Sequence, residues 1–162
     1  MIGWNWESTD MLRREKLKPV PEPASDGRYV LDEQIGFLLR VAMQRHTSIF
    51  TSQMIEGLTQ TQFAALAKLY EVGPCSQNYL GRLIFLDAAT IKGVVDRLSL
   101  RGFVTASNDP TDKRRRAVVL TEEGRKVTEA AIKVAEKITA DTLVTLTEEE
   151  RRTIARLLKK LA

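Results

Sequence analysis

The sequence has a single cysteine, Cys75, and a single histidine, His46. One cysteine excludes a disulfide within the chain. His46 stands in none of the cysteine, serine or acidic patterns that are typical of metal or catalytic centres, and no glycine-rich phosphate-binding loop occurs. We therefore expect no enzymatic activity, no metal and no cofactor.

Long apolar runs are also missing. No stretch approaches the ~18 residues of a membrane-spanning helix, and residues 1–27 lack the apolar core and small-residue cleavage site of a signal peptide. With 43% hydrophobic and 28% charged residues, the composition is typical of a globular protein. These features predict a cytoplasmic protein with no membrane partner.

Positive charge is concentrated in one part of the chain, although the net charge is only +4. Between Ser76 and Leu120, eight Lys and Arg residues stand against four acidic residues. The remaining 17 of the 25 basic residues balance the remaining 17 of the 21 acidic ones. A local basic excess on a nearly neutral body is typical of a polyanion site. Charge alone does not separate such a site from a solvated face.

Residues 1–28 are predicted to form an extended arm, because Pro19, Pro21 and Pro23 alternate with other residues and block a helix. Trp4 and Trp6 are unusual in such a segment, since buried indole rings contribute strongly to interfaces. Two interpretations stay open: the rings dock on a partner subunit, or they are ordinary tail residues.

Apolar residues at near-heptad spacing predict a long first helix over about 31–54. Its stripe comprises Leu31, Ile35, Leu38, Ala42, Ile49 and Gln53, widened by Leu39, Met43 and Phe50. Two further helices are predicted at the other end, from Thr121 to about Asp141 and over 148–161. Their apolar positions are Ile138, Leu143, Ile154, Leu157, Leu158 and Leu161. These positions exceed what a small core needs, so we expect a two-fold dimer through the terminal helices.

Three short helices with clear start signals are predicted between them. Thr59 and Gln62 form a capping box for a second helix that ends at Gly73-Pro74. Ser76 is the expected N-cap of a third helix over 77–85. The fourth helix, over 88–101, follows the N-cap Asp87 and ends at Gly102. The third and fourth helices, with the tight turn between them, form a helix-turn-helix pattern.

The predicted helix over 88–101 has two distinct faces. The inward face comprises Ile91, Val94, Val95 and Leu98, and the opposite face presents Ala89, Lys92, Gly93 and Asp96, with Thr90 and Arg97 at its flank. Small residues in the first turn allow a helix N-terminus to enter a major groove deeply, where hydroxyls and cations reach bases and phosphates. Any surface helix shows some such mixture, so this helix alone is weak evidence.

After Gly102 the apolar period changes from 3.6 to 2. Residues 103–107 and 116–120 are predicted strands. Four consecutive cations, Lys113 to Arg116, extend from the end of the loop between them into the second strand. A basic hairpin directly after such a helix is typical of a wing whose tip places arginine in the minor groove. Asp112 is close enough in sequence to brace Arg114. The pattern predicts a mainly α fold, a winged helix-turn-helix with a small β-hairpin wing, that binds double-stranded DNA.

The run "DKRRRAVVLTEEG" resembles the wing signature of the MarR family of transcription regulators. The matching positions are Asp112, Arg114, Val118, Leu120, Thr121 and Gly124. The preceding "AATIKGVVDRLSLRGFV" is similar to that family's recognition helix and first wing strand, and the helix order from about residue 31 also matches. The resemblance implies a MarR-like domain over 29–162, with dimerisation helices over 29–58 and 122–162 and a winged helix-turn-helix over 59–121.

The resemblance also implies a homodimeric repressor that binds an inverted-repeat operator and is released by a small ligand. Groove or phosphate contacts would come from Ala89, Thr90, Lys92 and Arg97, phosphate contacts at a helix N-terminus from Ser76 and Gln77, and wing contacts from Lys113, Arg114 and Arg115. Gly93 departs from the arginine that many relatives carry there.

By the same resemblance, effectors bind between the dimerisation helices and the winged lobe. The residues expected in that zone are Arg40, Met43, His46, Phe50, Phe63 and Tyr70. A mixture of aromatic surface and a cation suits an anionic aromatic, such as a phenolic acid, or its coenzyme A thioester. The alternative for His46 is a satisfied core histidine.

One other interpretation of the basic hairpin stays open from the sequence. A helical, dimeric adaptor would use the basic hairpin on acidic protein partners rather than on DNA. Cys75 is interpreted as a small buried apolar residue rather than as a redox sensor. Members of the family that sense peroxide carry a cysteine near the start of the first helix, and this chain has none there. We therefore expect ligand sensing rather than thiol sensing.

Overall fold

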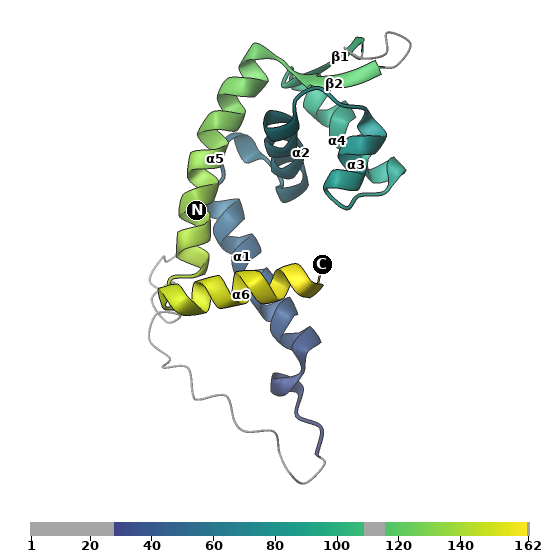
Figure 1. Cartoon of the computed structure of the whole chain (residues 1–162). Coiled ribbons are helices and arrows are strands. Elements are labelled where there is room, and N and C mark those ends of the chain that lie inside the picture. Colours follow the sequence, from purple (N-terminus) through teal and green to yellow (C-terminus); the bar gives the residue numbers. More distant parts are fainter. Residues whose placement is uncertain (1–27, 109–115, 162) are drawn as a thin grey trace, which may run out of the picture. The chain divides into compact units, whose positions relative to one another are not determined.

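The computed structural model describes residues 28–108 and 116–161 (Figure 1). The predicted Pro-containing arm with Trp4 and Trp6, and the predicted wing tip, therefore lie outside the described residues. Those described residues divide into two compact units, one up to Gln44 and one from Arg45 onward. No helix in the described part of the chain is long and apolar enough to span a membrane.

The boundary between the two units lies within the first long helix, α1, which extends over Ile35–Gln53. The predicted start near residue 31 was wrong. Residues Leu31–Glu33 form a 3-10 turn, η2, and Gln34 is extended. The Gln34 Nε2 donates to the backbone oxygen of Val30 at 2.9 Å, and this local bond competes with continuation of the helix.

The second unit contains the remaining elements in the predicted order. After a short 3-10 turn, η3 (Ile55–Gly57), come α2 (Gln60–Val72), α3 (Gln77–Leu83), α4 (Ala88–Leu100), β1 (Val104–Asn108), β2 (Arg116–Leu120), α5 (Glu122–Thr142) and α6 (Glu148–Leu161). The strands form one antiparallel hairpin in which Val104 pairs with Leu120. In Figure 1, α2, α3, α4 and the hairpin gather at the end of α5 where that helix begins. The mainly α fold with a hairpin wing is confirmed.

The helix starts agree with the capping signals in the sequence. Thr59 and Gln62 form the reciprocal capping box of α2, and Ser76, Asp87 and Thr121 each accept a backbone N–H in the first turn of their helices. Caps depend only on neighbouring residues, which is why the sequence places them so well.

The end of α3 was predicted two residues too late. The helix ends at Leu83, and Phe85 has a φ of 57° in the turn before α4. This left-handed conformation is costly for a residue with a Cβ, and no turn residue such as glycine marks it in the sequence.

One apolar core joins the end of α1, the helices α2 to α5 and the hairpin. Leu66, Leu80, Ile91 and Leu98 are fully buried in it, and Val94 and Val95 complete the predicted inward face of α4. Ile138, Phe50 and Met54 also belong to this core; the side chain of Ile138 is only 1% exposed. Assigning Ile138 to a dimer face was therefore a mistake, since it is buried within a single chain.

Candidate nucleic-acid interface and effector pocket

The outward face of α4 presents the predicted DNA contacts to solvent. Ala89, Thr90, Lys92 and Arg97 are all exposed. Asp87 caps this helix by accepting from the backbone N–H groups of Ala89 and Thr90 at 3.0 and 2.9 Å. The Thr90 hydroxyl also donates to Asp87 Oδ2 at 2.7 Å. These hydrogen bonds from Thr90 hold the pKa of Asp87 below its ordinary value.

The cations of α4 have different surroundings. Lys92 Nζ pairs with Asp96 at 2.6 Å. Arg101, the C-cap residue, donates to the backbone oxygen of Glu56 at 2.6 Å, and its guanidinium carbon lies 4.6 Å from the ring centre of Phe103. Arg97 has no such partner among the described residues. The end of α4 is therefore tied to η3, while Arg97 stays available to a ligand.

The N-terminus of α3 holds the predicted phosphate contacts. The Ser76 hydroxyl accepts from the backbone N–H of Tyr79 at 3.3 Å, and both Ser76 and Gln77 are half-buried. The Arg82 guanidinium lies 5.7 Å from the ring centre of Tyr79, and both side chains are exposed. The start of α3 thus combines unpaired helical N–H groups with a nearby cation.

The hairpin is fixed to the helices at its base. Cys75, just before α3, forms a bridge with Val118 of β2, with N–O distances of 3.3 and 2.8 Å. At the other side, the Thr121 hydroxyl donates to the Gly102 oxygen at 2.6 Å. Burial raises the pKa of the Cys75 thiol. The predicted contacts Lys113, Arg114 and Arg115, and the predicted brace Asp112, lie outside the described residues.

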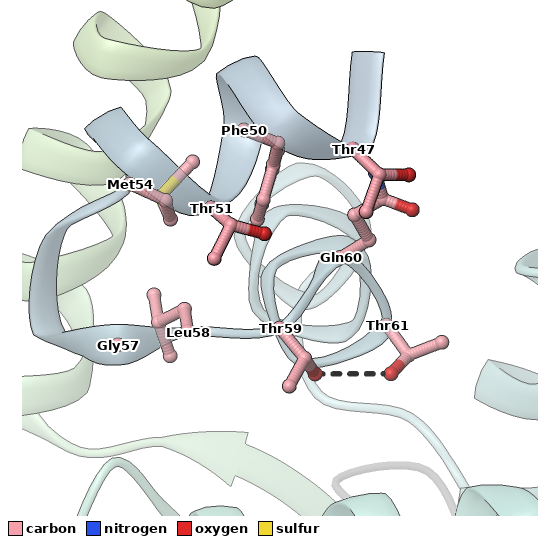
Figure 2. Close-up of a pocket in the computed structure, with 9 residues that line it drawn as sticks. All are labelled: Thr47, Phe50, Thr51, Met54, Gly57, Leu58, Thr59, Gln60 and Thr61. Atoms are coloured by element: carbon pink, nitrogen blue, oxygen red, sulfur yellow. Dashed lines mark hydrogen bonds between the residues drawn. The ribbon is translucent and has the colours of Figure 1, made fainter. Parts of the chain in front are cut away.

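A pocket of about 430 Å³ lies where α1 ends and α2 begins (Figure 2). It is lined by Thr47, Phe50, Thr51, Met54, Gly57, Leu58, Thr59, Gln60 and Thr61. Figure 2 shows Thr47, Phe50 and Thr51 on the α1 side and Leu58, Thr59 and Thr61 on the opposite side. Its apolar residues can contact an aromatic ring, and its hydroxyl groups can hydrogen-bond polar substituents. No charged side chain is among its nine lining residues.

The start of α2 forms part of the pocket lining. Thr59 is the N-cap, and its hydroxyl accepts from the N–H of Gln62. The N–H groups of Gln60 and Thr61, in the first turn of α2, have no acceptor in the described part of the chain. Such groups, together with the positive end of the helix dipole, favour an anion.

The structure brings together only some of the predicted ligand residues. Phe50 lines the pocket, and its ring centre lies 6.2 Å from that of His46 and 6.1 Å from that of Phe63. Tyr70 is turned to Glu129, to which its hydroxyl donates at 3.1 Å. Arg40 and Met43 lie in the unit that ends at Gln44, and both are exposed.

His46 also has a partner within the chain. Its Nδ1 lies 3.0 Å from the hydroxyl oxygen of Thr142, and that hydroxyl donates its proton to the Ile138 oxygen at 2.8 Å. Thr142 must therefore accept from His46, which places the imidazole proton on Nδ1. This contact links α1 to α5, as expected for a histidine with a structural role.

Sequence reasoning missed most of the pocket lining. The signal that could have found it is the density of hydroxyl and amide side chains at 47, 51 and 59–61, on both sides of the η3 turn. Gly57, with a φ of 55°, marks the turn in the sequence, whereas the φ of 54° at Glu56 has no such signal.

A helix-turn-helix with an exposed polar face on its second helix, followed at once by an anchored β-hairpin, defines a winged helix DNA-binding protein. Comparisons with known proteins agree. A model of the MarR family matches residues 58–115. The HTH-type transcriptional repressor NicR of Pseudomonas putida is 40% identical over 148 residues, which cover 91% of this chain and 94% of NicR.

Two solved structures extend the likeness. A probable transcriptional regulator from Pseudomonas aeruginosa is 49% identical with a TM-score of 0.78, covering 82% of this chain and 100% of that one. BpsR of Bordetella bronchiseptica, whose DNA binding is regulated by 6-hydroxynicotinic acid, is 40% identical with a TM-score of 0.77, covering 83% of this chain and 97% of BpsR. The chain belongs to the MarR family. It is a transcriptional repressor of that family and not an enzyme.

Proposed function

We propose that this repressor acts as a homodimer on an inverted-repeat operator and leaves it when a small aromatic carboxylate binds beside Phe50. The observation that carries the ligand class is the 40% identity to BpsR, whose DNA binding is regulated by 6-hydroxynicotinic acid. The pocket at Phe50 supports it, because about 430 Å³ suits a single substituted ring.

Exposed apolar residues support the dimer. The helix α6 has no buried residue within its own chain. Its apolar side chains Ile154, Leu157, Leu158 and Leu161 are all exposed, and Leu161 is 72% exposed. On α1, Ile35, Leu38, Leu39, Val41 and Met43 are exposed as well. Apolar faces of this kind are typical of subunit interfaces.

The dimer is tested by placing a charge on the apolar face of α6. Leu157→Glu combined with Leu161→Glu should give a monomer by light scattering and abolish tight operator binding. Thr145→Glu, at an exposed position before α6, is the matched control and should stay dimeric. A wild-type chain that is monomeric at micromolar concentration would contradict the proposal.

For DNA, a two-fold dimer should select an inverted repeat whose half-sites lie about 10 bp apart. Selection from a randomised duplex library reads the operator directly. Arg114→Ala should weaken binding to it by about 1–3 kcal/mol if this arginine reads the groove. Binding with no preference for a repeat, or equal binding to acidic polypeptides, would favour the adaptor alternative.

The proposed pose of the effector follows from the chemistry of the pocket lining. The ring would contact Phe50, Met54 and Leu58, and the carboxylate would accept from the N–H groups of Gln60 and Thr61. The positive end of α2 compensates for the lack of a charged side chain in the lining.

A proline substitution can test this pose at one atom. Proline is well accepted at the first position of a helix, and Thr59 before it is already extended, with ψ at 161°. Gln60→Pro therefore removes one N–H group while α2 keeps its fold. Losing one hydrogen bond to a charged group should weaken the effector about ten- to hundredfold. Gln60→Ala is the control, because it removes the same side chain and keeps the N–H.

The readout is fluorescence polarisation of a labelled operator, titrated with 6-hydroxynicotinic acid and with its neutral amide. The acid should release the wild-type protein, and the amide should do so poorly. Gln60→Pro should need more acid than Gln60→Ala. Release by an aromatic coenzyme A thioester alone, or equal responses of the two variants, would contradict this pose.

A further inference from the structure

Two cations, Lys92 and Arg97, lie in α4, and a third, Arg101, caps its end. Lys92 and Arg101 have interaction partners within the described residues. Lys92 is paired with Asp96 one turn along the helix. Arg101 is held by the backbone oxygen and the carboxylate of Glu56, at 2.6 and 3.4 Å, and by the ring of Phe103. Arg97 alone of the three has no ion pair or hydrogen bond among the described residues. It is also exposed on the outward face.

The Arg97 side chain lies across Gly93. A Cβ placed on Gly93 would be 3.5 and 3.7 Å from the two terminal nitrogens of Arg97, and 3.9 Å from the carbon between them. The guanidinium therefore lies at ordinary contact distance from a Cβ at position 93, where a side chain longer than alanine would meet it. Glycine costs a helix interior about 0.5–1 kcal/mol relative to alanine, so its presence here needs a compensating reason.

This arrangement places the positive charge of Arg97 nearer to the start of α4. Helical side chains lean toward the N-terminus, and a residue lies over the one four positions before it. The Arg97 guanidinium is thus displaced by about one turn, roughly 5.4 Å, toward the first turn of α4. In a winged helix the first turns of this helix are the part that enters the major groove.

The neighbouring Thr90 is complementary to this arginine. Positions 90, 93 and 97 share one face of the helix. The Thr90 hydroxyl proton is committed to Asp87, so its outward lone pairs can only accept a hydrogen bond. On this face of the helix, Arg97 supplies the hydrogen-bond donors. Its planar guanidinium group can donate to both the N7 and the O6 acceptors of guanine.

We propose that Arg97, lying across Gly93, is the residue with which α4 reads a guanine in the major groove, and that Gly93 is needed for this specificity. The inference rests on the proposed binding of an operator. Lys92, paired with Asp96, contributes charge but no comparable discrimination. The alternative is that Arg97 contacts a DNA phosphate and does not recognise a base.

The test combines protein variants with changes of single atoms in the DNA. The operator selected by the full-length wild-type chain is synthesised with 7-deazaguanine at each guanine of one half-site in turn. This base lacks the N7 acceptor and keeps its Watson–Crick pairing. Affinities are measured for the wild type, Arg97→Ala, Gly93→Leu and the control Ser99→Leu, which adds the same side chain at an exposed position elsewhere on α4. Thermal melts confirm that each variant is folded.

We expect one guanine per half-site at which the 7-deaza change weakens the wild type about tenfold. Arg97→Ala should lose affinity for the normal operator by about 5- to 150-fold, and the 7-deaza change should then have no further effect, as a double-mutant cycle requires. Gly93→Leu should also lose the N7 dependence although Arg97 is present, whereas Ser99→Leu should retain it.

Two results overturn the inference while leaving the repressor function intact. One is an N7 dependence that persists in Gly93→Leu or in Arg97→Ala. The other is a uniform loss in Arg97→Ala across all sequences with a flatter salt dependence, which identifies a phosphate contact. If the wild type selects no operator at all, the proposed function itself fails, and the inference with it.

Discussion

Replacing Gly124 with alanine should be among the most destabilising single-methyl changes in this protein. Gly124 lies in the first turn of α5, where the helix backbone presses against the chain that leads into β1. A Cβ at this position would lie only 1.8 Å from the Phe103 oxygen and 2.7 Å from its carbonyl carbon. Both neighbours are backbone atoms, so no side-chain rotation can relieve the overlap.

The expected loss of stability in Gly124→Ala can be estimated from how far the two backbone segments must move apart. To restore even 3.0 Å between the Cβ and the Phe103 oxygen, the two backbones must separate by more than 1 Å. Overpacking of this kind costs about 1–3 kcal/mol. The same oxygen accepts from the N–H of Thr121 at 3.0 Å, and losing this bond adds about 1 kcal/mol. We therefore expect the free energy of unfolding to fall by about 2–4 kcal/mol.

Urea unfolding followed by circular dichroism measures the change, at one fixed protein concentration because a dimer's stability depends on it. With an m-value near 2 kcal/mol/M, the midpoint should fall by about 1–2 M. Gly93→Ala is the matched control: its Cβ meets only the Arg97 guanidinium, at 3.5 Å, and helix propensity should raise stability by up to about 1 kcal/mol. A Gly124→Ala protein as stable as the wild type would refute the reasoning.

Three further outcomes are expected. Thr59→Ala removes the capping box with Gln62 and should cost about 1 kcal/mol in the same urea assay, whereas Thr59→Ser should cost less. Cys75 is buried and its thiol pKa is raised, so thiol reagents should react slowly with the native protein and rapidly in urea, and peroxide should not release the operator. Hydrogen bonds from Thr90 lower the pKa of Asp87 below 3.8, so its contribution to stability is complete above that pH and is lost as pH falls through the lowered value. Over that pH range, the free energy of unfolding should fall less in Asp87→Asn than in the wild type.

The helix starts and the inward face of α4 could be predicted from the sequence because both depend on local chemistry. Thr59, Asp87 and Thr121 bond to N–H groups two or three residues away, and the spacing of apolar residues alone sets which side of α4 is buried. The MarR-like hairpin was predicted from a short contiguous motif for the same reason.

What the sequence did not reveal depends on backbone conformations without a residue signal, or on contacts between distant segments. Glu56 and Phe85 adopt left-handed conformations that their residue types do not announce. The pocket lies between the end of α1 and the start of α2, beside the turn that contains Glu56. The burial of Ile138 depends on packing between elements far apart in sequence, and the position of the Arg97 guanidinium over Gly93 depends on a rotamer.

The contact of Arg101 with Glu56 has a consequence for the energetics of control. It joins the end of α4, the helix proposed to contact DNA, to Glu56, which directly precedes the pocket-lining residue Gly57. If the proposed effector shifts this wall and the operator holds α4, the two ligands are coupled through this single contact. By thermodynamic reciprocity, the factor by which the effector weakens the operator must equal the factor by which the operator weakens the effector. Calorimetric titration of the effector into the free and the DNA-bound repressor would measure this coupling from both sides.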